Sequence, residues 1–560
     1  MSVPKRMNDS VHWFMNDLSS RIIAQTGIPN DRFHLGKLIF QSLKDDPEFL
    51  LQIDGSTGES ETNGSVLKRS IQCAIALTNL GLKREDIIVI MAPNHIHLTI
   101  PFYASLYIGV GTSAVDRTLG PSMYPFLLSF LFELKECFEV SRPKVIFCQN
   151  EKVTDVQLAL DKLDHNAHII TFDNGDYLLN YEEFLRKYGD DTSVDHFRPS
   201  DFDPEKTTAL LIATSGTTGL PKSATVTHKN IAITNPYLWI KESQFPSPTR
   251  MVLICSPMQW MTAIINFVLS PIIRYTRLQS TESITPEHAA YIIDKYKPTF
   301  TIMSPTLMTT LLKNGLAKNC DMSCFELIYL AGSAVSRELL EDVKQVMPHT
   351  EVRNIFGMTE LSSIAFMQDN GPIESCGKPL GCFQYRLVSL ETKKDIIEPN
   401  ISGELWVNGP GIFKEYYNNP QATLETFAED RWFKTGDMFY RDEHYNYYYV
   451  ERIKLLLKYR NHQISPLELE TVIRQHPAVQ DVAVAGIPDA ECGDLPVACV
   501  VIRTGHTVTA QEIKDLVKDN LTDTKQLRGG VIFLNEIPMT ANTKIHRRKL
   551  KELVLTMDKE

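Results

Sequence analysis

The feature that most constrains the fold is a repeated alternation of apolar strands with helical patterns. An amphipathic pattern over residues 66–82 precedes the apolar run 87–92, IIVIMA. Further apolar runs, each beside a helical pattern, follow at 144–148, 168–172, 209–213, 252–255, 299–303 and 327–331. Strands that alternate with helices are typical of doubly wound sheets with helices on both faces. The sequence therefore predicts layered α/β structure over this part of the chain.

The pattern changes twice toward the C-terminus. From about Gly381, short alternating segments such as 383–389 and 403–409 predict a smaller, mostly antiparallel region. After Tyr449, the sequence predicts one strand over 452–460, a helix over 466–477, and strands at 482–487 and 497–502. We therefore expect an α/β plus α+β protein. Its large N-terminal domain, residues 1–452, would hold layered α/β subdomains and a β-rich subdomain, and residues 453–560 would form a small α+β domain.

Composition excludes several classes of function. The 57 Lys and Arg residues against 68 Asp and Glu give a net charge of −11, without a long block of either sign. A nucleic-acid partner is therefore not expected, because phosphate contacts need clustered Lys and Arg. The ten cysteines form no Cys-x-x-Cys pair. This spacing argues against a disulfide scaffold and against a zinc ribbon.

Two uncharged stretches, 97–115 and 251–273, are long enough to cross a membrane. Each contains proline and several polar groups, so we interpret both as buried core and expect no transmembrane segment. The N-terminus lacks the apolar core of a signal peptide, and the C-terminus is not a peroxisomal tripeptide. These features predict a cytoplasmic location, with a peroxisomal one left open.

The strongest local signal is the run TSGTTGLPK at 214–222, directly after the strand ALLIA. Its glycines let the backbone approach a ligand, its N–H and hydroxyl groups donate hydrogen bonds, and its lysine neutralises negative charge. It is not the P-loop of ATPases, which needs glycine directly before the lysine, because Pro221 stands there. The run predicts a phosphate-binding loop.

Three further segments are ambiguous alone but informative together. FGMTE at 356–360 combines an aromatic ring with a hydroxyl and with a carboxylate that suits Mg²⁺. KTGD at 434–437 places a carboxylate just after an expected tight turn, where it would accept two ribose hydroxyls. MTANTK at 539–544 ends in a lysine on a polar loop.

The order TSGTTGLPK, FGMTE, KTGD, ERIKLLLKYRNHQISPLELE and a C-terminal lysine resembles the adenylate-forming superfamily over residues 40–553. This superfamily contains acyl-CoA synthetases, coumarate–CoA ligases and beetle luciferases. The run GPGIFKEYYNNPQATLETF is most similar to insect luciferase-like fatty acyl-CoA synthetases. The resemblance implies that a carboxylate reacts with Mg·ATP to give acyl-AMP and pyrophosphate, after which the thiol of coenzyme A displaces AMP.

The resemblance also implies roles for individual residues. Thr359 would contact the α-phosphate, Glu360 would hold Mg²⁺, and Lys544 would reach the carboxylate–phosphate junction; these three are the expected catalytic residues. The loop residues expected to bind the β- and γ-phosphates are Thr214, Ser215, Gly216, Thr217, Thr218, Gly219 and Lys222. The residues expected to hold adenine and ribose are Gly332, Ser333, Phe356, Gly357, Asp437 and Arg452.

The remaining implied roles concern the acyl group, coenzyme A and domain rotation. Trp260, Ala331 and Ala334 would line the acyl pocket, and Lys454 would be the hinge of a mobile C-terminal domain. Lys458 and Asn461 would lie along the coenzyme A tunnel. The expected partners are small molecules only, namely the carboxylate, ATP and coenzyme A, and the oligomeric state stays open.

The chain departs from the family pattern in four places: Ser223, Asn542–Thr543, Glu415 and Asn461. Asn461 matters most, because it replaces a glycine that lines the tunnel during thioester formation. We therefore expect an AMP-forming fatty acid–CoA ligase for a medium- or long-chain acid or a similar apolar carboxylate. Two alternatives stay open: a luciferase-like oxidative enzyme that adenylates its substrate, for which Lys458 is in place, and a degenerate member impaired in the coenzyme A step.

Overall fold

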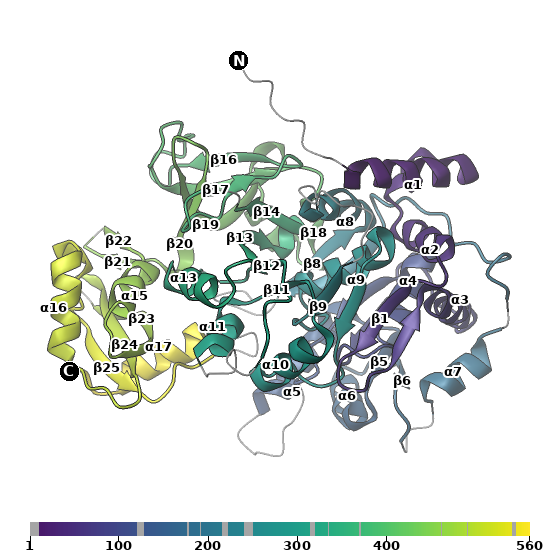
Figure 1. Ribbon diagram of the computed structural model, residues 1–560, viewed down its shortest axis with the longest axis horizontal. Coiled ribbons are helices and arrows are strands. Elements are labelled where there is room, and N and C mark those ends of the chain that lie inside the picture. Colours follow the sequence, from purple (N-terminus) through teal and green to yellow (C-terminus); the bar gives the residue numbers. More distant parts are fainter. Residues whose placement is uncertain are drawn as a thin grey trace.

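The computed structural model describes residues 10–119, 128–175, 179–190, 192–214, 222–239, 250–313, 320–333, 335, 337–368, 371–460, 462–489, 491–539 and 545–560. Over these residues the chain forms a large part, built on three sheets, and a small part at the C-terminal end, built on a fourth (Figure 1). The predicted fold class, a large α/β domain with a β-rich region and a small α+β domain, is confirmed.

The first sheet has seven strands in the order β18-β8-β7-β4-β3-β5-β6. Five neighbouring strands, β7, β4, β3, β5 and β6, run parallel to one another. β8 and β18 run antiparallel to their neighbours. β3 is buried on both faces, which explains its continuous apolar run. The strand bounds are β3 Ile87–Met91, β4 Gly111–Ala114, β5 Val145–Cys148, β6 His168–Thr171, β7 Thr208–Thr214, β8 Lys222–Thr227 and β18 Glu415–Tyr416.

The second sheet has nine strands in the order β15-β14-β13-β12-β11-β9-β10-β1-β2. The six from β13 to β1 are parallel, and the antiparallel strands lie at the two edges. The strand bounds are β1 Leu50–Asp54, β2 Ser60–Thr62, β9 Met251–Ile254, β10 Thr276–Gln279, β11 Phe300–Met303, β12 Leu327–Leu330, β13 Glu351–Met358, β14 Ser363–Met367 and β15 Lys378–Pro379.

Helices cover these two sheets (Figure 1). The uncharged stretches 97–115 and 251–273 become α4 with β4 and β9 with α9, and both are almost wholly buried. Among the described residues, no helix is long and apolar enough to cross a membrane. The helix bounds are α1 Ser10–Thr26, α2 Leu35–Asp45, α3 Asn63–Asn79, α4 Thr99–Ile108, α5 Leu128–Ser141, α6 Val153–Lys162, α7 Tyr181–Tyr188, α8 His228–Thr234, α9 Met261–Ile273, α10 Pro286–Tyr296, α11 Pro305–Lys313 and α13 Arg337–Val346.

The β-rich region is a four-stranded antiparallel sheet in the order β16-β17-β19-β20. A short helix, α14 (Pro420–Thr426), lies in the connection that also carries β18. The strand bounds are β16 Gln384–Val388, β17 Gly403–Asn408, β19 Phe433–Arg441 and β20 Tyr447–Arg452.

Over its described residues, the small part holds five strands and three α-helices. Its two clusters of buried apolar residues contain only residues from Leu457 onward, and the clusters of the large part contain none of these. The predicted strand over 452–460 was wrong in extent: a 3₁₀ turn at Ile453–Leu455 interrupts it. The bounds are β21 Leu457–Tyr459, β22 His462–Ile464, β23 Val479–Asp489, β24 Gly493–Ile502, β25 Gly530–Leu534, α15 Pro466–Arg474, α16 Ala510–Asn520 and α17 Arg547–Thr556.

Candidate active site

The predicted phosphate loop joins two paired strands, β7 and β8. Thr214 ends β7 and pairs with Lys222, which begins β8, and the Thr214 hydroxyl donates to the Lys222 carbonyl over 3.1 Å. The hairpin therefore fixes both ends of the loop. The expected phosphate ligands between them, Ser215, Gly216, Thr217, Thr218 and Gly219, lie outside the described residues.

Tyr416 links Lys222 to Glu360. The ammonium of Lys222 lies 4.9 Å from the centre of the Tyr416 ring, and the Tyr416 hydroxyl donates to Glu360 Oε1 over 2.8 Å. β18 pairs with β8, and this pairing brings Tyr416 beside Lys222. Burial first, and then the Glu360 carboxylate, raise the pKa of Tyr416, so the phenol stays protonated and donates.

Glu360 and Thr359 begin a 3₁₀ turn directly after β13. Glu360 is buried, and its backbone carbonyl accepts the N–H of Phe413 over 2.8 Å. Within the part of the chain that the structure describes, no three acidic, cysteine or histidine side chains are grouped to hold a metal. A single carboxylate suits magnesium that arrives with a nucleotide, because Mg²⁺ is usually bound through one or two carboxylates plus phosphates and water.

Asp437 and Arg452 face each other across β19 and β20. Arg452 Nε lies 2.8 Å from Asp437 Oδ1, and Asp437 is only 1% exposed. The Asp437 carboxylate is the largest influence that raises the pKa of Arg452, and Glu360 and Tyr416 contribute to the same rise. The pair therefore lies close enough to the Glu360 group to belong to one site.

The tight turn expected at KTGD was wrong, because the segment is part of β19. Glu404 and Trp406 of β17 pair with Met438 and Lys434, so extra residues of β19 form a bulge between them. Gly436 has a φ of +72° at this bulge, which is a conformation that glycine adopts at low cost. The bulge turns Asp437 toward Arg452.

A cluster of aromatic rings involves the same two strands, β19 and β20, that carry Asp437 and Arg452. Phe356, at the end of β13, packs edge-on against Phe439 at 4.8 Å and parallel to Tyr449 at 6.4 Å between ring centres. Gly357 follows Phe356. A β-carbon at this position would lie only 2.5 Å from the backbone carbonyl oxygen of Ser363, so there is no room for a side chain. The exposed residues Gly332 and Ser333 follow β12, the strand next to β13, and Gly332 has a φ of +96°.

Two of the predicted acyl-pocket residues follow the carboxyl ends of parallel strands in the nine-stranded sheet. Trp260 precedes α9 after β9, and Ala331 follows β12, with β11 between the two strands. Trp260 and Ala331 are both half-buried, whereas Ala334 lies outside the described residues. The carboxyl ends of parallel strands are the usual place for ligands in open α/β sheets.

The predicted residues of the small part are only partly described. Lys454 lies in the 3₁₀ turn after β20 and Lys458 in β21, and both side chains are exposed. Asn461 and Lys544 lie outside the described residues. Arg452 is the final residue of β20, the last strand of the β-rich sheet, so the chain passes directly from the site into the small part.

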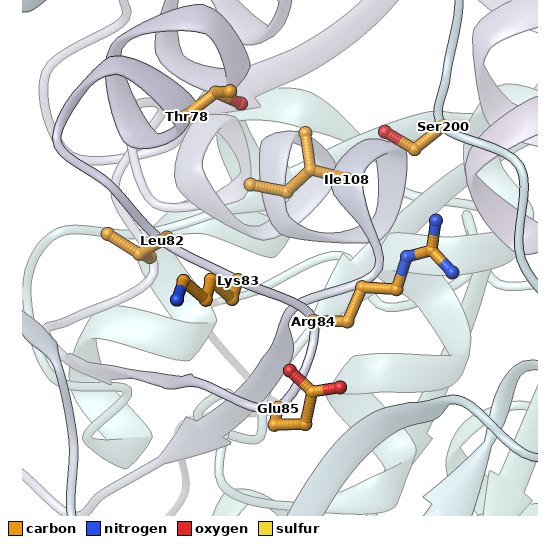
Figure 2. A pocket seen from close by; sticks show the side chains of 7 residues that line it. All are labelled: Thr78, Leu82, Lys83, Arg84, Glu85, Ile108 and Ser200. Atoms are coloured by element: carbon orange, nitrogen blue, oxygen red, sulfur yellow. The ribbon is translucent and has the colours of Figure 1, made fainter.

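A cavity of about 410 Å³ opens elsewhere, between the α3–β3 connection, the end of α4 and Ser200. Figure 2 shows Arg84 extending toward Ser200 across this cavity, with Ile108 beside them. None of the predicted site residues lines this cavity, so it is separate from the candidate active site.

Sequence and structure comparisons identify the class. A family model described as AMP-binding enzyme matches residues 41–417, and one described as AMP-binding enzyme C-terminal domain matches residues 468–544. Luciferin 4-monooxygenase from Photuris pensylvanica is 31% identical over 510 residues, 89% of this chain and 90% of that protein. The 4-coumarate–CoA ligase-like 9 of Arabidopsis thaliana is 28% identical over 519 residues, 90% of this chain and 86% of that protein.

Solved structures share the fold at lower sequence identity. ATP-bound MatB from Rhodopseudomonas palustris has a TM-score of 0.81 and 21% identity, with 93% of this chain and 98% of that chain covered. The anthranilate–CoA ligase AuaEII in complex with anthranoyl-AMP has a TM-score of 0.81 and 20% identity, with 93% and 97% covered.

The fold and the grouped motifs thus define an adenylate-forming enzyme. The chain belongs to the AMP-binding enzyme family. CoA ligases of this family use ATP, Mg²⁺ and coenzyme A, and their partners are small-molecule substrates.

Proposed function

We propose that the chain is an ATP-dependent fatty acid–CoA ligase for a medium- or long-chain acid or a similar apolar carboxylate. The carboxylate oxygen attacks the α-phosphorus of Mg·ATP, and the bond to pyrophosphate breaks, which leaves acyl-AMP. The thiol of coenzyme A then attacks the acyl carbon, loses its proton and displaces AMP. The observation that carries the proposal is the convergence of Lys222, Tyr416, Glu360, Arg452 and Asp437 from four strands and the 3₁₀ turn after β13.

Each of these groups has a role in the first half-reaction. Lys222 and the loop that precedes it neutralise the β- and γ-phosphates, and Glu360, oriented by Tyr416, holds the magnesium ion of Mg·ATP. Thr359 donates to the α-phosphate, and Lys544 reaches the developing charge at the carboxylate–phosphate junction. Donors that are already in place stabilise such charge because they need no reorganisation.

Adenine and ribose occupy the neighbouring strand ends. The adenine stacks on Phe356, beside Gly357 and the turn of Gly332 and Ser333. Asp437 accepts the ribose hydroxyls, and Arg452 holds that carboxylate in place over 2.8 Å. Trp260, Ala331 and Ala334 form the entrance to the acyl pocket, at the carboxyl ends of β9 and β12.

The second half-reaction needs the small domain in another orientation. We place the domain boundary between Arg452 and Ile453, with Lys454 as the hinge and with Lys458 and Asn461 beside the coenzyme A tunnel. The separate apolar clusters on the two sides of this boundary support the division. A cytoplasmic location stays a prediction from the sequence.

A second candidate function is oxidative light emission, because several relatives near 30% identity are luciferin 4-monooxygenases of fireflies. Lys458 is the residue of this chain that would serve near the oxidative step. A degenerate enzyme that stops at acyl-AMP is the third candidate, and Asn461 is the feature that favours it.

One assay separates the three candidates. Pyrophosphate release and acyl-CoA formation are measured over a panel of fatty acids of increasing chain length, with and without coenzyme A, and luminescence with luciferin is recorded in parallel. A ligase forms acyl-CoA with at least one acid of the panel. Pyrophosphate without any thioester identifies the degenerate enzyme, and light with oxygen consumption identifies the oxidative one.

A further inference from the structure

Glu451 is a buried carboxylate that connects the two parts of the molecule. It lies in β20, immediately before Arg452, and is 3% exposed. Its Oε2 accepts the backbone N–H of Leu467 over 3.1 Å and the hydroxyl of Ser465 over 3.4 Å. Its Oε1 accepts the N–H of Arg452 over 2.9 Å. Glu451 belongs to the four-stranded sheet, whereas Ser465 and Leu467 begin α15 of the small part.

The carboxylate acts as a cap on α15. The first helical residue, Pro466, has no N–H, and the N–H of Glu468 is bonded to the Ser465 hydroxyl over 3.3 Å. The N–H of Leu467 is the donor that Glu451 satisfies. A helix N-terminus carries free N–H groups and partial positive charge, so a carboxylate is favoured there. The small part thus obtains one of its helix caps from the large part.

This contact depends on how the two parts are oriented. Residue 451 precedes the 3₁₀ turn that contains Lys454, and residues 465–467 follow it. The Ser465 hydroxyl also lies 3.3 Å from the Val450 carbonyl, so strand β20 holds the start of α15 at two points. Rotation of the small domain at Lys454 would separate these atoms and leave the Leu467 N–H without this acceptor.

In the orientation that Glu451 holds, helix α17 lies between the core of the small part and the large part (Figure 1). Arg547 begins α17, three residues after Lys544, and donates to Glu470 over 3.0 Å and to the Val484 carbonyl over 2.8 Å. Burial is the main cause that raises the pKa of Glu451 and of Tyr449, and the charge of Arg547 opposes both rises. In Figure 1, α17 lies on the side of the small part that is nearer the large part.

We propose that Glu451 is a positioning residue, which holds the small domain in the adenylate-forming orientation by capping α15 across the domain boundary. This inference rests on the proposed function, in which Lys544 acts in that orientation and thioester formation requires another. Glu451 acts through the helix and does not itself contact the substrate.

The proposal predicts a change in the ratio of the two half-reactions. When the orientations exchange faster than the chemistry, the ratio of adenylation rate to transfer rate is proportional to their equilibrium constant. Loss of one charge-assisted contact shifts such an equilibrium by about tenfold. We therefore expect Glu451→Ala to lower that ratio about tenfold. Glu451→Gln, which keeps one acceptor oxygen, should fall between the parent and the alanine variant.

The rates are measured separately on the full chain. Adenylation is followed by pyrophosphate release in a single turnover, and transfer by mixing preformed acyl-AMP with coenzyme A. The matched control is Glu512→Ala, which removes a carboxylate that caps α16 entirely within the small part, through Thr509 N–H and hydroxyl bonds of 2.8 Å. The control ratio should stay at the parent value.

Hydrogen exchange of residues 464–470 provides a readout that needs no enzymatic activity. Exchange at Leu467 should quicken about tenfold in Glu451→Ala and stay unchanged in Glu512→Ala. Unchanged exchange in Glu451→Ala would overturn the proposal, and so would faster exchange with both half-reactions slowed equally. A parent enzyme that never transfers its acyl group to coenzyme A would reject the proposed function instead, and exchange together with adenylation rate would still decide the role of Glu451.

Discussion

Asp437 is held by Arg452 in a buried position, so its carboxylate is already in place before a nucleotide binds. A contact of that kind stabilises the bound substrate and the transition state alike. We therefore predict that Asp437→Ala raises KM for ATP about tenfold and lowers kcat less. Steady-state kinetics with varied ATP test this. A normal KM for ATP would show that the bulge of β19 has a structural role only.

Lys544, unlike Asp437, is expected to stabilise only a transition state, and only that of the first half-reaction. Lys544→Ala should slow acyl-AMP formation by about 3–4 kcal/mol, roughly a hundred- to a thousandfold. The transfer of preformed acyl-AMP to coenzyme A should keep the parent rate. Rapid-mixing measurements of each half-reaction check this division, and equal losses in both would contradict it.

Tyr416 shows where residue-level prediction stopped. Residue types in the motifs predicted Lys222, Glu360 and Asp437 as site residues, because they suit phosphate, magnesium and ribose chemistry, and the family resemblance added Arg452. Tyr416 lies in KEYYNNP, where nothing in residue type or spacing separates it from its neighbour Tyr417. Only the pairing of β18 with β8 brings its hydroxyl to Glu360, and that pairing is a long-range contact.

At the scale of elements, the hairpin β21–β22 matters most for the coenzyme A step. Tyr459 pairs with His462, and Arg460 has a φ of +45° directly before Asn461. We predict that Asn461→Gly speeds transfer from acyl-AMP to coenzyme A severalfold and leaves adenylation unchanged, which follows from the role proposed for Asn461 beside the coenzyme A tunnel. The same change should cost up to about 1 kcal/mol of stability through added backbone freedom.

Single-turnover transfer in the parent and the glycine variant measures this effect. An unchanged transfer rate would mean that the Asn461 side chain does not obstruct the tunnel.

Apolar runs predicted seven parallel strands of the two large sheets to within one residue, because a strand buried on both faces is often apolar throughout. The parallel strands β1, β4, β10 and β13 were not predicted. Prediction failed where backbone geometry depends on a partner. KTGD looked like a turn, yet β17 and β20 keep it within a strand as a bulge. RIKLLLKYR looked like one strand, yet it divides at a 3₁₀ turn on the way into the small part. Neither feature has a local sequence signal.

For the whole molecule, a buried histidine makes stability depend on pH. Burial lowers the pKa of His34 to about 4, while its ring accepts from the Lys37 N–H and lies 3.0 Å from the Ser200 carbonyl. The unfolded chain binds a proton below pH 6.5 that the folded chain refuses, so stability falls between pH 6.5 and about 4. At pH 5 the loss from His34 is about 2 kcal/mol relative to pH 7.

Denaturant unfolding of the parent at pH 7 and pH 5 measures this loss, and His34→Gln should reduce it. The control is His444→Gln on an exposed loop, which should leave the difference unchanged. A His34 variant with the parent's pH dependence would contradict the prediction.

The separation of the apolar clusters near residue 453 has a consequence for spectroscopy. All five tryptophans, at positions 13, 239, 260, 406 and 432, precede that boundary. The tryptophan fluorescence of the protein is therefore a label for the large part alone. Unfolding of the small part would not change tryptophan emission directly, whereas far-ultraviolet circular dichroism would detect it. The difference between the melting temperatures from these two signals would therefore measure how strongly the two parts unfold together.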